Sequence, residues 1–276
     1  MASAPFNAAA APANDNSIPS LDQQLLSAAE FGETAKIIEL LAQGANINAR
    51  QTNEDTALHI AAREGHLDTV KLLIEKNADT SLVNNFQQTA LMVSVREHQD
   101  EQINLALINA KTPVNQQDGK GRTAAYFAAQ DGLQLTTRAL GEAGADFSLT
   151  GIDGVTPLIW ATRLPGKHET IDVITSYPTA GLDAQDEQGR SALMEAAVKN
   201  DQKLAEKYIG LDAKVMLYDN DQKRAKDLAQ EFGSSEALKT IQAAEAAIYQ
   251  PLTAGVSGQI AAPRTAKFRP KQPVTE

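Results

Sequence analysis

Residues 56–62 read Thr-Ala-Leu-His-Ile-Ala-Ala, and this stretch decides the fold. Its first three positions, a small polar residue, then Ala or Pro, then usually Leu, recur along the chain. The recurrences begin at Thr56, Thr89, Thr123, Thr156 and Ser191, with a degraded copy at Arg224. They are 33, 34, 33, 35 and 33 residues apart, and 33 residues before Leu58 stands Leu25 in a similar stretch. Self-similarity at a fixed period indicates a repeat architecture, here of about seven units.

A second set of positions keeps the same spacing, twelve residues before each of these starting residues. They are Gly44, Asn77, Lys111, Gly144, Thr179 and Asp212. Gly and Asn tolerate the left-handed backbone conformation that ends many helices, so this position is predicted to be a helix end. Lys111, Thr179 and Asp212 match the preference poorly, and we expect those three ends to be looser or differently shaped.

Each unit is predicted to form two helices and a turn. Thr56 suits the N-cap of a first helix that Gly65 ends, and residues 67–75 supply the apolar side of a second helix. Turn-forming residues follow, such as Asp118-Gly119-Lys120-Gly121, which predict a hairpin. Ser20 and Gln23 form a plausible capping box at the start of the first unit.

The units share the pattern T-[AP]-L-x-x-A-A, then Gly, an Ile/Val/Leu helix, G-A-x-[VI]-N and D-x-x-G. This pattern resembles the ankyrin repeat over about residues 21–250. The resemblance implies an all-α solenoid of about seven helix-turn-helix units with short β-hairpin loops. It also implies protein binding on a concave surface of hairpin tips and first helices, usually without catalysis. The sequence departs from the pattern at His98, where Gly is expected, at Pro165-Gly166 and at Tyr177-Pro178.

Composition excludes several other classes of protein. Lys+Arg 25 against Asp+Glu 35 gives a net charge of -10, which argues against nucleic-acid binding because phosphates would be repelled. No apolar run reaches the roughly 18 residues of a membrane span. Cysteine is absent, the four histidines lack metal-ligand spacing, and no phosphate-binding loop or nucleophile motif is present. We therefore expect no enzyme, no cofactor and no metal.

The chain divides into three segments. Residues 1–20 are Ala/Pro-rich and predicted to be disordered, residues 21–250 form the repeat domain, and residues 251–276 are predicted to be a flexible basic tail. Residues 267–271 within that tail are a possible docking peptide, although a solubilising role is the simpler interpretation. The beginning lacks the features of a signal peptide, so a cytoplasmic location is expected, or a periplasmic or secreted one if a signal was removed before residue 1.

Positions that recur with the repeat predict the binding residues. Two positions of each unit are considered: the residue directly before the starting residue and the residue seven positions after the starting residue. Together they predict a partly basic groove on an acidic body. Its members are Arg63, Arg96, Arg122, Arg163, Arg190 and Lys223. Such a row suits an acidic, extended segment of another protein. The alternative is that these positions are merely polar and that exposed ion pairs contribute little.

Apolar side chains at the hairpin tips are the other candidates. Phe86 and Ile152 stand where polar residues are usual, and exposed aromatic groups are common binding anchors. Phe86 could instead fold back onto the next unit, whereas Tyr126 and Trp160 are expected in the core.

Three functions remain open at this point. The first is a monomeric intracellular scaffold or inhibitor of another protein. The second is a secreted or periplasmic bacterial protein acting on a host or envelope partner, since the Ala/Pro-rich acidic composition suggests a bacterial source. The third, a hydrolase with a site between repeats, is a distant alternative.

Overall fold

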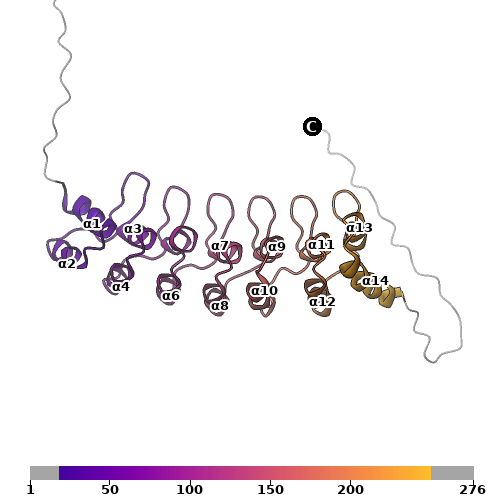
Figure 1. Cartoon of the computed structure of the whole chain (residues 1–276). Coiled ribbons are helices and arrows are strands. Elements are labelled where there is room, and N and C mark those ends of the chain that lie inside the picture. Colours follow the sequence, from indigo (N-terminus) through magenta and orange to yellow (C-terminus); the bar gives the residue numbers. More distant parts are fainter. Residues whose placement is uncertain (1–18, 250–276) are drawn as a thin grey trace, which may run out of the picture.

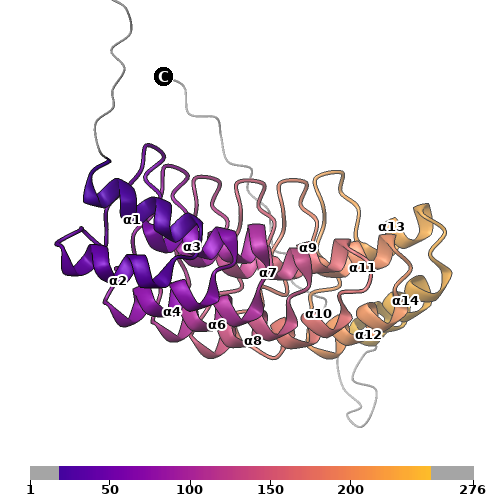
Figure 2. The same ribbon diagram turned by 60° about the vertical axis from the view of Figure 1, so that its left-hand side comes forward.

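The computed structural model describes residues 19–249 as seven helix pairs stacked in single file (Figure 1). Loops project from one side of the row, and the second helices line the opposite side (Figure 2). The pairs are α1 (Leu21–Glu30) with α2 (Thr34–Ala42), α3 (Ala57–Glu64) with α4 (Leu67–Glu75), α5 (Ala90–Val93) and the π-helix η1 (Ser94–His98) with α6 (Glu101–Asn109), α7 (Ala124–Asp131) with α8 (Gln134–Glu142), α9 (Pro157–Arg163) with α10 (His168–Thr175), α11 (Ala192–Val198) with α12 (Gln202–Gly210), and α13 (Ala225–Glu231) with α14 (Ser235–Tyr249).

The all-α repeat fold predicted from the sequence is therefore confirmed. Two predicted segments lie wholly or almost wholly outside the described residues. They are the disordered segment, residues 1–20, of which only the last two are described, and the tail, residues 251–276, with the docking peptide inside it.

The predicted N-caps start the first helices. The hydroxyls of Thr89, Thr123, Thr156 and Ser191 each accept a hydrogen bond from the N–H three residues ahead. Ser20 and Gln23 form the predicted capping box. At Thr56 the box is completed by His59, whose Nδ1 lies 3.3 Å from the Thr56 nitrogen. Each cap satisfies backbone donors that have no partner within the helix, and so fixes where the helix begins.

Both departures in the first helices are local insertions. The left-handed residue that ends α3 is Gly65, but in the next unit His98 stays helical and Gln99 takes that conformation, with φ 60. The 34-residue step is thus absorbed by the π-helix, which accommodates one extra residue per turn. In the fifth unit, α9 ends at Arg163 and Gly166 adopts the left-handed conformation, so Pro165-Gly166 lengthens the connection.

The prediction that three second helices end irregularly is confirmed at Thr179 and is wrong at Lys111 and Asp212. Lys111 and Asp212 adopt φ 60 and φ 64, close to the value of Asn77. The residue after Asp212 donates its N–H to the Tyr208 carbonyl at 3.0 Å, as in a regular helix cap. Such bonds offset the roughly 1–2 kcal/mol that a left-handed residue costs. Thr179 differs because Pro178, with its fixed φ, precedes it, and among the described residues Thr179 is not one with positive φ.

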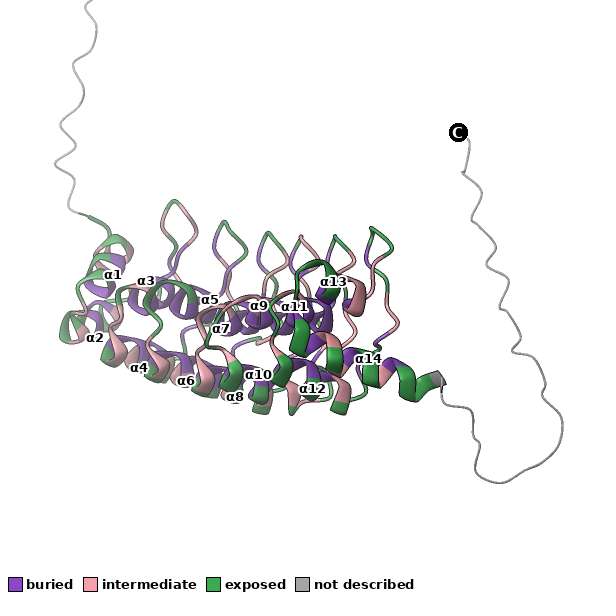
Figure 3. Ribbon diagram, turned by 45° about the vertical axis from the view of Figure 1, so that its right-hand side comes forward, coloured by how far each residue is buried: buried purple, intermediate pink, exposed green. Residues whose placement is uncertain are grey.

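Burial follows the first helices, which form the interior of the row (Figure 3). The alanines at the ends of their apolar stretches, such as Ala61 and Ala62, are fully buried and let neighbouring helices approach closely. Leu58, Leu91 and Leu158 occupy equivalent buried positions in one continuous cluster. No unit buries its own apolar face alone, so stability depends on the stacking of neighbours.

Six loops of one shape connect the units. In each, the first residue donates its N–H to the fifth residue's carbonyl, as Gln51 does to Asp55 at 3.0 Å, and the fourth residue has positive φ. The expected β-hairpins are therefore closed turns, and the described part of the chain contains one isolated β-bridge, Arg50 with Thr56, instead of strands. The loops span residues 51–55, 84–88, 118–122, 151–155, 186–190 and 219–223.

Neighbouring loops are tied together by their backbones. The N–H of the second residue of each loop donates to the third residue's carbonyl in the preceding loop. Examples are Gly119 to Phe86 at 3.0 Å and Ile152 to Lys120 at 2.7 Å. All five junctions carry this bond. The loop tips therefore form a continuous row with fixed spacing.

Candidate binding surface

Arg63 and Arg122 are held by carboxylates buried in the loops. Arg63 Nη1 lies 2.5 Å from Asp55 Oδ2, and the Asp55 side chain is 1% exposed. Arg122 donates from both Nε and Nη2 to Asp118 Oδ2, at 3.0 and 2.7 Å. The two guanidinium groups thus neutralise carboxylates that would otherwise be buried without a counter-charge.

These pairs keep the loop carboxylates ionised. Burial by itself would raise the pKa of Asp55, but hydrogen bonds from Asn84, Arg63 and Asn53 outweigh burial, and the pKa lies below its usual value. Burial opposes ionisation of Asp118 in the same way, and bonds from Arg122 and from backbone N–H groups lower its pKa. Asp118 therefore anchors the loop backbone and an arginine at once, whereas Asp55 anchors an arginine and neighbouring amide side chains.

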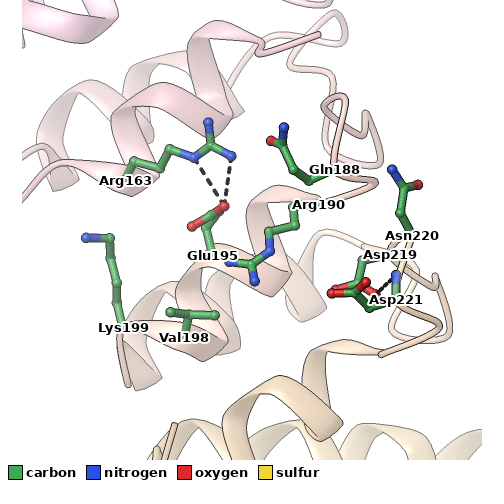
Figure 4. A pocket seen from close by; sticks show the side chains of 9 residues that line it. All are labelled: Arg163, Gln188, Arg190, Glu195, Val198, Lys199, Asp219, Asn220 and Asp221. Atoms are coloured by element: carbon green, nitrogen blue, oxygen red, sulfur yellow. Dashed lines mark hydrogen bonds and ion pairs between the residues drawn. The ribbon is translucent and has the colours of Figure 1, made fainter. Parts of the chain in front are cut away.

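Arg163 joins two units. Its guanidinium bonds Asp186 in the next loop. It also bonds Glu195 on α11, with Nη2 2.9 Å from Glu195 Oε1 (Figure 4). The side chains of Asp186 and Glu195 are 0% and 7% exposed. Burial alone would lower the pKa of Arg163, but the charges and hydrogen bonds of the two carboxylates raise it. Arg163 therefore stabilises the junction between the fifth and sixth units.

The remaining predicted cations are more accessible. Arg96 pairs with Glu97 at 2.6 Å and Lys223 with Glu231 at 2.6 Å, and all four side chains are at least 38% exposed. Such pairs contribute about 0–1 kcal/mol and exchange readily for other partners. The Arg190 guanidinium has no hydrogen-bond or ion-pair partner within residues 19–249.

Two pockets show which predicted residues lie together. The first, about 490 Å³, contains Arg163, Arg190 and Lys199 beside Glu195, Asp219 and Asp221, so its charges balance (Figure 4). Its lining also includes Gln188, Val198 and Asn220.

The second pocket, about 410 Å³, lies between the second and third loops. Phe86 forms part of its wall, and its cations Arg96, Lys120 and Arg122 outnumber its single carboxylate, Asp118. Neither pocket includes Arg63, Ile152 or Lys223. These two pockets therefore bring together Arg163 with Arg190, and Phe86 with Arg96 and Arg122.

The apolar tips are open to solvent. Phe86 is 63% exposed and Ile152 is 75% exposed, so Phe86 does not fold back onto the next unit. Tyr126 and Trp160 behave as expected for core residues: Tyr126 is buried, Trp160 is half-buried, and their rings stack with centroids 6.0 Å apart.

Sequence reasoning missed the buried loop carboxylates Asp55, Asp118, Asp186 and Asp219. A usable signal existed, because an aspartate stands at the first loop position in three of the six loops. What the sequence did not show is that this carboxylate turns inward, where its oxygen accepts two backbone N–H groups of the same loop, as at Asp186 from Gln188 and Arg190.

The histidines have structural contacts. His59 is buried between Thr56 and the Gln88 carbonyl, and burial lowers its pKa. His66 Nε2 lies 2.9 Å from the Glu30 carbonyl oxygen of the preceding unit. No cluster of three or more His, Cys, Asp or Glu side chains that could hold a metal ion occurs in the described part of the chain. Over the same residues, no helix is long and apolar enough to cross a bilayer.

Comparisons with known proteins agree with this architecture. The family profile described as ankyrin repeats (3 copies) matches residues 25–112. A probable E3 ubiquitin-protein ligase, XBOS33, of Oryza sativa subsp. japonica is 37% identical over 120 residues, which is 43% of this chain and 23% of that protein. The ankyrin repeat and KH domain-containing protein mask-1 of Caenorhabditis elegans is 33% identical over 141 residues, 50% of this chain and 5% of its own length.

A third relative is the nuclear factor NF-kappa-B p105 subunit of Gallus gallus, 34% identical over 144 residues, 50% of this chain and 14% of that protein. The chain thus spans less than a quarter of each of these relatives.

Proposed function

Because this chain belongs to the ankyrin-repeat family, we propose that it is a non-enzymatic binding protein that holds another protein against its loop row and first helices. The observation that supports this most directly is the exposure of Phe86 and Ile152 on loops that hydrogen bonds hold in place. Large apolar side chains on rigid, ordered loops lose little conformational freedom on binding, and such side chains are typical binding anchors.

The arginines take two roles in this proposal. Arg63, Arg122 and Arg163 are positioned by buried carboxylates and present their remaining N–H donors to a partner. Arg96 and Lys223 can exchange their exposed ion pairs for a partner's carboxylates, and Arg190 has no side-chain partner among the described residues. An acidic, extended segment of the partner is the ligand that fits both groups. Monomeric state and cytoplasmic location remain predictions, to be tested by light scattering and by fractionation of the tagged chain.

Site-specific photo-crosslinking tests the proposal. A photo-reactive residue at Gln87, on an exposed loop tip, is expected to capture another protein in cells. The matched control is Lys71, which is exposed on the outer side of α4. Capture at Lys71 alone, or equal capture at both positions, would contradict binding on the loop row, and capture at neither would contradict protein binding itself.

A further inference from the structure

The six loop tips differ in charge between the middle and the ends of the row. The three central tips expose Phe86, Lys120 and Ile152. The flanking tips carry acids instead: Glu54, which is half-buried and paired with Arg50, on one side, and the exposed Glu187 and Asp221 on the other. On a chain with a net charge of -10, this central stretch carries the exposed cation Lys120 between two exposed apolar side chains, with one half-buried carboxylate, Asp153.

We propose that the three central tips form the docking site for an acidic segment of a partner protein that carries two apolar side chains. In this arrangement one apolar side chain packs on Phe86, the other on Ile152, and a carboxylate between them meets Lys120. The proposal rests on the proposed function and names the chemistry and the register of its ligand.

The charge of the pocket beside Phe86 supports an acidic ligand. Asp118 is already matched by Arg122, and Arg96 is held only by an exposed contact with Glu97. Lys120 is exposed and has no side-chain partner among the described residues. A carboxylate entering this pocket meets Lys120 directly and replaces Glu97 on Arg96, so it gains charge-assisted hydrogen bonds without leaving a buried charge unpaired.

The carboxylate next to Ile152 does not cancel this preference. Asp153 Oδ1 accepts the N–H of Val155 at 3.2 Å, within its own loop. That bond turns the charge toward the loop backbone, away from the apolar side chain beside it.

The fixed spacing of the loops sets the length of the ligand. Packed helices lie about 8–10 Å apart, so Phe86 and Ile152, two units apart, are separated by roughly 16–20 Å. An extended chain advances about 3.3 Å per residue, and it covers this distance in five or six residues. The ligand is therefore an extended segment with two apolar residues five or six positions apart and an acid between them.

The acidic outer tips restrict the register. If such a segment moved by one unit toward the C-terminal end, its carboxylate would leave Lys120 and face the apolar side chain of Ile152. Its second apolar group would then lie against Glu187. Loss of the contact with Lys120 and loss of apolar burial both disfavour that position, which gives specificity for one register.

A peptide selection tests this site. Random 12-residue peptides displayed on phage are selected on the full chain and counter-selected on the variant F86S/K120E/I152S, in which all three changes are at exposed positions. The enriched peptides are expected to share two apolar residues five or six apart with Asp or Glu between them. Peptides without that spacing, or absence of enrichment, would overturn the proposal.

Point variants then measure the affinity of the best synthetic peptide by fluorescence anisotropy. Phe86→Ser and Lys120→Glu are each expected to weaken binding about tenfold or more. The controls Phe31→Ser and Lys71→Glu, exposed elsewhere, are expected to stay within about twofold of the unaltered chain. Equal effects of the test and control variants would show that the site is wrong. If crosslinking at Gln87 still captures a partner in that case, the proposed function stands without it.

Discussion

Replacing Arg163 by alanine tests whether this arginine stabilises the fold or is only available to a binding partner. Arg163 neutralises Asp186 and Glu195, whose side chains are 0% and 7% exposed. Its own side chain is 23% exposed, so part of the pair is still solvated. Removing one partner from a fully buried ion pair costs about 3–5 kcal/mol. We expect about 3 kcal/mol here, because the partial exposure favours the lower end and Asp186 keeps two backbone hydrogen bonds.

Arg190→Ala is the matched control. It removes the same side chain from the same pocket, but Arg190 has no side-chain hydrogen bond or ion pair in residues 19–249. The expected cost is within about 0.5 kcal/mol, as for other surface changes. The double variant R163A/E195Q removes one of the two unpaired charges and is expected to recover about 1 kcal/mol of the loss.

Urea unfolding followed by two signals measures these effects. Trp160, the single tryptophan of the chain, lies on α9 in the same unit as Arg163, whereas far-ultraviolet circular dichroism reports all helices. Stability in a solenoid depends on each junction, so loss of the junction between the fifth and sixth units is expected to shift the Trp160 transition to lower urea than the helical transition. A cost for Arg163→Ala no larger than that for Arg190→Ala would refute this account of the ion pairs.

Three further changes probe the cap, the buried histidine and the core. Gly65→Ala is expected to lower the free energy of unfolding in urea by at least about 2 kcal/mol, because φ is +80 and the new methyl group meets His98. The control is Gly44→Ala, where φ is +95 and no atom lies within 4 Å of the new methyl group. It is expected to cost only the backbone strain of about 1–2 kcal/mol. Burial lowers the pKa of His59, so below about pH 6.5 the unfolded chain binds a proton that the folded chain does not. The free energy of unfolding is therefore expected to fall as the pH drops below that value, and to fall less in the His59→Gln variant. Tyr208→Phe removes the buried hydrogen bond between the hydroxyls of Tyr208 and Thr162. It is expected to lower the free energy of unfolding, measured by calorimetry, by about 1 kcal/mol.

The sequence was sufficient for the repeat and for most of its local structure. The Thr and Ser caps, Gly65 and the second helix at Leu67–Glu75 follow from short-range rules, because each depends on residues within one or two helical turns. The 34-residue step and His98 in place of Gly marked a departure in the third unit. It did not show that the π-helix Ser94–His98 would absorb it, because several local solutions have similar energies.

The candidate site was less predictable, since its contacts cross between units. Arg163 is 23 residues before Asp186 and 32 before Glu195 in the chain. A periodic row of arginines indicates which residues share a surface, but it does not show which carboxylates that surface already contains. The exposure of Phe86 was likewise open from sequence, because folding back or pointing outward depends on the neighbouring loop.

The buried loop carboxylates change how this surface should be understood as a ligand site. An arginine already paired with a buried aspartate contributes shape and donors, but little net charge, so a row of such arginines attracts an anion weakly. Among the loop residues that the structure describes, Lys120 and Arg190 are cations whose side chains have no hydrogen-bond or ion-pair partner, so selectivity depends on them and on the apolar tips. Lys120 lies between Phe86 and Ile152, whereas Arg190 lies in a pocket whose charges balance. The physical contrast between these two cations is why the centre of the row, and not its C-terminal pocket, is the place where an acidic apolar segment would bind with a defined register.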